Sequence, residues 1–121
     1  MVEYSDDAKL SRLLKAVSDS TRRALLTQLC QQGASRVTDL ANHYDISLNA
    51  ISKHIKVLEG AGLVTRQMHG RTHWIEADLR QVELMSAWLE SLKSIWALSL
   101  DKLDDVLNEG EKNDRPDRKP E

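Results

Sequence analysis

The sequence predicts a mainly α-helical protein with a small β-hairpin and a long C-terminal helix. Through most of the chain, apolar residues recur every three or four positions, which is the period of an amphipathic helix. The stretch 63–75 is instead rich in strand-forming residues and has a glycine near its middle. A length of 121 residues fits one domain, with little room for a second.

Two helices are expected at the N-terminal end, over 8–17 and 21–32. Between them, Ser18-Asp19-Ser20 supplies side-chain oxygens that can cap the second helix, and Gly33 follows its end, where helices often stop. Eight residues are predicted to face inward: Leu10, Leu13, Leu14, Val17, Leu25, Leu26, Leu29 and Cys30.

Two further helices are expected over 37–44 and 48–60. The residues between them, Asp45-Ile46-Ser47, form a tight connection, and Ser47 is a favourable N-cap. In the fourth helix, apolar positions are spaced by three, four and three residues and so form one inward stripe: Leu48, Ile51, Ile55 and Leu58.

A hairpin and a long last helix complete the pattern. Strands are expected over 63–68 and 71–75, and His69-Gly70 between them reads as a two-residue turn, which would set Arg66 opposite His73. Asp78 is expected to cap a helix over 79–107. We expect residues 1–107 to form one domain, and the charged segment 108–121 to be a disordered tail.

This order of elements is that of a winged helix-turn-helix, in which the helix after the tight turn enters the DNA major groove. In this chain that helix is 48–60, and the hairpin 63–77 is the wing expected on the DNA backbone. Outward positions of the helix carry amides, hydroxyls and cations, which suit base edges and phosphates. The predicted DNA-binding residues are Ser47, Asn49, Ala50, Ser52, Lys53, His54, Lys56, Arg66, His69 and Arg71.

Charge divides the chain into two halves. Residues 1–75 carry a formal charge of +3 and residues 76–121 carry −5, which together give the net −2 of the whole chain. A polyanion would therefore meet the first half, and the second half is expected to face elsewhere. Its long helix has a wide apolar face that one small domain cannot cover, so we expect a homodimer. The predicted interface residues are Leu10, Leu14, Met85, Trp88, Leu89, Leu92, Trp96 and Leu103.

Four segments resemble the ArsR family of bacterial repressors. They are LKAVSDSTRR (14–23), NAISKHIKVL (49–58), AGLV (61–64) and the wing tip Gly70-Arg71, and Trp88 and Trp96 are similar to one subgroup. The resemblance covers roughly Leu10 to Leu107 and implies a homodimeric DNA-binding repressor that a signal releases from DNA. The chain departs from the family at Ser20, where proline is common, and at Tyr44-Asp45, where Leu-Gly is common.

The metal chemistry of the family is not expected here. Metal-sensing members carry a Cys-x-Cys-like pair at the third helix, whereas this chain has Arg36-Val37-Thr38-Asp39-Leu40, and no histidine follows His73. Zinc needs three or four converging ligands. We therefore expect no metal and no cofactor. We also expect no enzyme, because phosphate-loop, nucleophile-elbow and HExxH motifs are absent from the sequence.

Some alternatives stay open. The chain could be a winged-helix protein-interaction module, or a redox-responsive regulator acting through Cys30, its single cysteine. His54 could hydrogen-bond DNA or brace its helix. A small-molecule inducer of unknown identity is possible. The acidic start of the chain is unlike a secretory signal, and no stretch is apolar enough for a membrane span, so a cytoplasmic location is expected.

Overall fold

The computed structural model describes residues 6–114, which form five helices and three strands. Two units are distinguished, one ending at Ser86 and the other beginning at Ala87, and each is described by itself. The elements are α1 (Asp6–Ala16), α2 (Ser20–Gln32), β1 (Ser35–Arg36), α3 (Val37–Tyr44), α4 (Leu48–Gly60), β2 (Val64–His69), β3 (Thr72–Ala77) and α5 (Val82–Asp114). The mainly α architecture with a small hairpin is thus the one that the sequence predicts.

Local sequence signals explain the start of α2 and the tight turn before α4. Asp19 caps α2, its carboxylate accepting a hydrogen bond from the Arg22 N–H at 3.0 Å. At the tight turn before α4, Asp45 takes the left-handed conformation with φ 51° and ψ 43°. Asp and Asn tolerate this conformation better than most residues, so the turn forms without the glycine common in the family.

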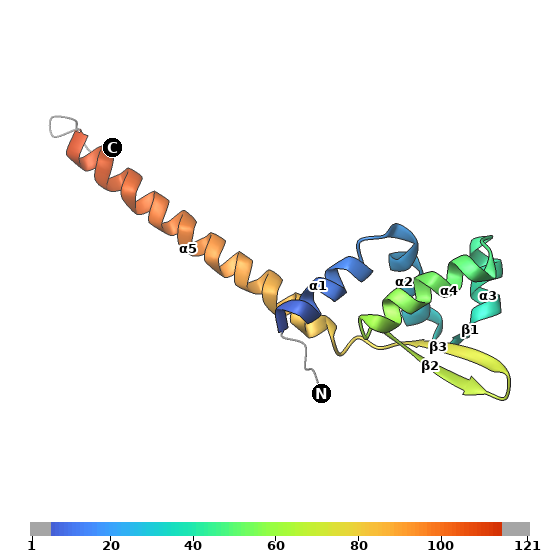
Figure 1. Cartoon of the computed structure of the whole chain (residues 1–121). Helices are drawn as coiled ribbons and strands as arrows, with labels where there is room; N and C mark the ends of the chain where they lie inside the picture. Colours follow the sequence, from blue (N-terminus) through green and yellow to red (C-terminus); the bar gives the residue numbers. More distant parts are fainter. Residues whose placement is uncertain (1–5, 115–121) are drawn as a thin grey trace. The chain divides into compact units, whose positions relative to one another are not determined.

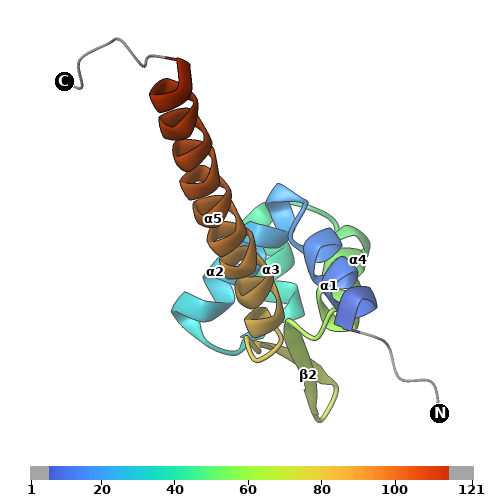
Figure 2. The same cartoon turned by 90° about the vertical axis from the view of Figure 1, so that its left-hand side faces the viewer.

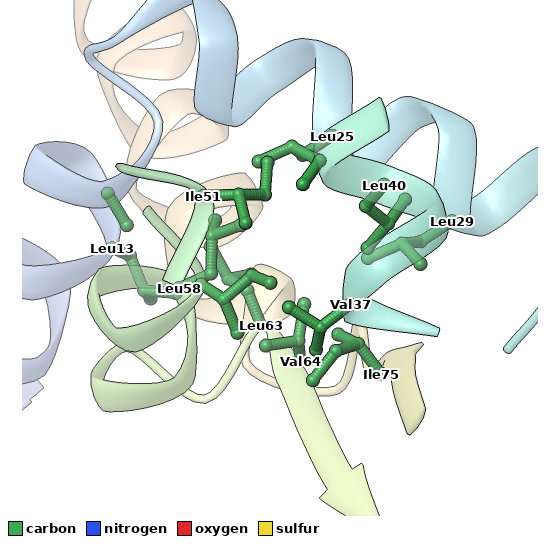
Figure 3. Packing of buried hydrophobic residues seen from close by; sticks show 13 residues of the cluster. Leu13, Leu25, Leu29, Val37, Leu40, Ile51, Leu58, Leu63, Val64 and Ile75 are labelled. Atoms are coloured by element: carbon green, nitrogen blue, oxygen red, sulfur yellow. The ribbon is translucent and has the colours of Figure 1, made fainter. Parts of the chain in front are cut away.

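The core of the first unit is built where four helices and the hairpin meet. Figure 2 shows α1 lying alongside α4, the two elements being in contact. In Figure 3, Leu13 of α1 lies near Leu58 of α4, while Val37, Val64 and Ile75 gather where α3 meets the strands. All five are buried. Burial of this set fixes α3, α4 and the base of the wing as one body.

The sheet differs from the prediction in two ways. A third strand, β1, pairs with β3, so the order is β1-β3-β2. The hairpin turn is Gly70-Arg71 rather than His69-Gly70, because His69 pairs with Thr72. Gly70 has φ 65°, which suits the first position of a two-residue turn, where type II′ turns place glycine. The shift by one residue puts Arg66 opposite Ile75, not opposite His73.

The last helix also has different ends from those expected. Asp78 does not cap it: its carboxylate accepts from the Arg80 N–H at 3.1 Å and closes a short turn, and α5 begins at Val82. The helix continues through Asp114, so 108–114 is helical where a disordered tail was predicted. The rest of the predicted tail, 115–121, lies outside the described residues. No helix in the described part of the chain has the length and hydropathy to cross a membrane.

Three residues predicted to face inward are exposed. Leu48 has 52% of its surface exposed, and Leu14 and Cys30 are also exposed. In α2 the buried positions are Leu25 and Leu29, which share one face, and Cys30 lies about 100° around the helix from Leu29. The core covers a stripe too narrow to include it.

Candidate nucleic-acid interface

The outward face of α4 is positioned by its N-cap. The Ser47 hydroxyl oxygen accepts a hydrogen bond from the Ala50 N–H at 3.0 Å, which fixes the start of the helix. Asn49, Lys53 and Lys56 are exposed, and Ala50 and Ser52 are half-buried. Ile51, Ile55 and Leu58 hold the opposite face in the core with none of their surface exposed. The helix therefore presents an amide, a hydroxyl and two cations on a rigid support.

Leu48 modifies this picture. Its exposure contradicts the prediction that it belongs to the inward stripe of α4, and Met68 on the wing is exposed as well. Leu48 lies at the N-terminal end of α4, beside the polar positions. In a major groove, an apolar group of this kind can contact a thymine methyl.

His54 is drawn toward the interior. Its Nδ1 atom lies 3.8 Å from the Asp19 carboxylate, and only 25% of the side chain is exposed. Asp19 is the N-cap of α2, and its hydrogen bond from the Arg22 N–H holds the pKa of its carboxyl group below the ordinary value. A charged carboxylate facing His54 favours the bracing role among the two left open by the sequence.

The wing carries its cations in different surroundings. Figure 1 shows β2 and β3 extending from the end of α4 as a two-stranded arm. Arg71 lies in the turn at the tip of this arm, where both it and the neighbouring His69 are exposed. Arg66 lies halfway along β2 and is half-buried, with its guanidinium 3.2 Å from the Glu59 carboxylate. Along the wing, only the tip therefore presents a freely exposed guanidinium group, that of Arg71.

A groove of about 310 Å³ lies where α3, α4 and the wing meet. No carboxylate lines it, and three arginines do. Its full lining is Arg36, Val37, Thr38, Leu48, Ser52, Arg66, Arg71, Thr72 and His73. Arg36 and Thr38 were missed by the sequence reasoning, which looked only at α4 and the hairpin. Their signal was their place at the start of α3, where unpaired backbone N–H groups and the helix dipole favour an anion.

Arg36 has one partner at this edge. Its guanidinium donates to both carboxylate oxygens of Asp39, at 2.9 and 3.2 Å, and both side chains are about half exposed. An exposed pair one turn apart is weak and exchanges readily with water or another anion. Arg36 can therefore turn toward an oxyanion in the groove at small cost.

The predicted dimer residues are mostly exposed. Trp96 has 66% of its surface exposed, and Leu14, Trp88, Leu89, Leu92 and Leu103 are exposed too. Leu10 is half-buried, and Met85 packs partly against the core of the first unit. Within the described residues, no group of three or more His, Cys, Asp or Glu side chains could hold a metal ion.

Comparisons with known proteins agree with this geometry. A family model described as a helix-turn-helix domain matches residues 17–67. The chain is 31% identical over 88 residues to an arsenical resistance operon repressor of Bacillus subtilis (strain 168), covering 73% of this chain and 82% of the relative.

Solved structures give the same result. An ArsR family transcriptional regulator is 30% identical, with a TM-score of 0.71, over 80% of this chain and 97% of that one. An ArsR-like transcriptional regulator from Rhodococcus sp. RHA1 is 28% identical, with a TM-score of 0.72, over 83% and 93%.

Proposed function

Because the chain belongs to the ArsR family of winged helix-turn-helix transcriptional regulators, we propose that it is a homodimeric repressor that binds an inverted-repeat operator. The two α4 helices enter successive major grooves, and the two wings lie on the flanking backbone. The observation that carries this proposal is the polar and cationic outer face of α4, held rigid by its buried opposite face.

The residues divide by the kind of contact that they make. Asn49 and Ser52 face base edges, since their amide and hydroxyl groups can discriminate bases. Lys53, Lys56 and Arg71 face phosphates, which fix the register without reading sequence. Ser47, Ala50 and His69 complete the contact surface, while His54 braces α4 through Asp19.

The groove adds a backbone contact to this set. Arg36 and Thr38 lie at the start of α3, and Arg71 reaches the same groove from the wing. A backbone phosphate beside α4 would meet guanidinium groups, a hydroxyl and the N-terminus of a helix together. This arrangement joins the reading helix and the wing to one DNA strand.

Dimerisation follows from the apolar face of α5. In the second unit, its exposed large apolar residues include Trp88, Leu89, Leu92, Trp96, Leu103 and Val106. Water-exposed apolar surface on this scale marks an interface, and an operator with two half-sites calls for the same helix of a second copy. A stable contact would bury on the order of 1,200–2,000 Å².

Selection from a library of random-sequence duplexes tests the proposal. Sequencing the bound fraction should show an inverted repeat, with half-site centres about 10 base pairs or a multiple apart. A chain without α4 contacts, made by substituting Asn49, Ser52 and Lys53 with alanine, is the control and should select nothing. If the wild-type chain selects no repeat, the proposed function is wrong.

A further inference from the structure

Arg66 joins the reading helix to both strands of the wing. Its Nη2 group donates to Glu59 Oε1 at 3.2 Å, and its Nη1 group lies 3.3 Å from His73 Nδ1. Glu59 is in the last turn of α4, and His73 is in β3. Arg66, opposite buried Ile75, lies on the core-facing side of the hairpin. The planar guanidinium fork can address two partners at once in this way.

The position of this link along the wing gives it leverage. The base of the arm is fixed by buried Val64, two residues before Arg66, whereas β2 continues for three residues beyond Arg66 to His69, where the turn begins. At roughly 3.4 Å per residue, the arm extends about 10 Å past the link. A tilt of about 10° at Arg66 would move the tip by about 2 Å, which is enough to break a hydrogen bond made there.

Without its ion pair to Arg66, the negative charge of Glu59 would be electrostatically unfavourable where it lies. A carboxylate in the last turn of a helix faces the negative end of the helix dipole. It also puts a negative charge on the same side of α4 as Ser52 and Lys56, which are proposed to meet DNA. Its side chain is 35% exposed and that of Arg66 25%, so the pair is partly shielded from solvent. The two formal charges cancel, which leaves Arg66 little attraction for a phosphate.

We propose that Arg66 is a positioning residue, which with Glu59 and His73 clamps the wing to the reading helix, and that it is not a phosphate contact. The proposal rests on the proposed DNA-binding function and revises the expectation that Arg66 touches DNA. The clamp sets the direction of the arm, so that Arg71 and α4 meet one DNA strand together.

The sign of one substitution separates the two roles. Glu59→Gln weakens the clamp, because a neutral amide oxygen replaces the carboxylate as the acceptor, and it also removes a negative charge. If Arg66 is part of a clamp, operator binding weakens by about 5- to 25-fold, the value for one or two half-buried ion pairs lost in a dimer. If Arg66 contacts phosphate, Glu59→Gln frees it and binding becomes tighter. Glu76→Gln, at an exposed position of the same hairpin, is the matched control for the removed charge and should not weaken binding.

Salt dependence gives a second readout. The double variant Glu59→Gln/Arg66→Gln keeps the net charge of the chain. With a clamp it binds as weakly as Glu59→Gln, and the slope of log affinity against log salt is that of the wild type. With a phosphate contact on each protomer, the slope falls in magnitude by about 1.8. The single variant Arg66→Lys should bind the operator more weakly than the wild type if both arms of the guanidinium fork are needed. It should bind as tightly as the wild type if only a charge is needed.

Amide hydrogen exchange measured on the protein without DNA tests the clamp independently of the proposed function. Amides of the ladder beyond Arg66, from Met68 to His73, should exchange faster in Glu59→Gln than in Glu76→Gln, while the urea midpoint of unfolding changes little. Unchanged exchange, or tighter operator binding by Glu59→Gln, overturns the clamp. A wild-type chain that selects no operator overturns only the proposed function.

Discussion

Replacing Trp96 with alanine tests whether α5 carries the dimer. Trp96 lies on the apolar stripe of α5, in register with Leu89, Leu92 and Leu103 at spacings that add to whole heptads. In the single chain 66% of its surface is exposed, so the indole contributes little to the stability of the described part of one chain. If a second copy covers it, the substitution acts on assembly and leaves the fold of the chain intact.

The size of the effect follows from that exposed area. A tryptophan that becomes covered buries at most about 250 Å², and two thirds of this is about 160 Å². At roughly 25 cal/mol per Å², covering it contributes about 4 kcal/mol, of which alanine keeps about a quarter. Two copies in a dimer therefore lose about 6 kcal/mol, which raises the dimer dissociation constant by about four powers of ten.

Light scattering at micromolar concentration measures the outcome. The wild type should be a dimer, and Trp96→Ala a folded monomer with unchanged circular dichroism and much weaker operator binding. Leu98→Ala is the matched control: Leu98 is 63% exposed, but two residues from Trp96 it lies on the other side of the helix. A Trp96→Ala chain that stays dimeric, or a Leu98→Ala chain that dissociates equally, refutes the assignment of this stripe.

Three further outcomes are expected. Asn49→Ala and Ser52→Ala should each weaken binding to the selected operator by about 1–3 kcal/mol and leave binding to random duplexes nearly unchanged. Equal losses of affinity for the operator and for random duplexes would show that neither residue reads a base. Arg71→Ala should weaken both kinds of binding alike and lower the salt slope by about 1.8 for a dimer; an unchanged slope would remove Arg71 from the backbone contacts. Arg80 donates to the Asp78 carboxylate and lowers the pKa of Asp78 to about 2 from 3.8, so the folded state gains stability above pH 3.8 and loses it as the pH falls toward 2. Asp78→Asn should therefore be less stable near neutral pH and lose less stability on acidification, as followed by urea midpoints between pH 5 and 2; parallel profiles for the two chains would contradict this.

The parts of the fold that depend on neighbouring residues were predictable. The bounds of α3 and α4 agree with the sequence prediction, because each helix has a continuous apolar stripe and a recognisable start or stop. Ser47 caps α4 as expected, since the N-cap preference is a contact between residues three positions apart. The left-handed turn at Asp45 depends likewise on the properties of a single residue.

Features that depend on partners distant in sequence were not predictable. Strand β1 has two residues and exists only because β3 offers an edge to Ser35 and Arg36. The exposure of Leu48 follows from where the hairpin ends and where the groove opens. The apolar period of α4 includes Leu48. Periodicity shows which face of a helix is apolar, but it does not show how much of the length of that face other elements cover.

The role of Arg66 shows how a small error in register changes a functional interpretation. Counted with a His69-Gly70 turn, Arg66 and His73 are directly opposed on the arm, and Arg66 is then expected to meet phosphate. With the Gly70-Arg71 turn, Arg66 is opposite buried Ile75, so its side chain extends along the core-facing side toward Glu59. One residue in the turn thus decides whether the middle of the wing adds charge to the DNA surface or stiffness to the arm. Because the Glu59 carboxylate already neutralises this guanidinium, the attraction of the wing for the DNA backbone is concentrated at the tip, on Arg71. The rest of the wing then has to hold Arg71 in the right position, and a stiff arm does so better than a loose one.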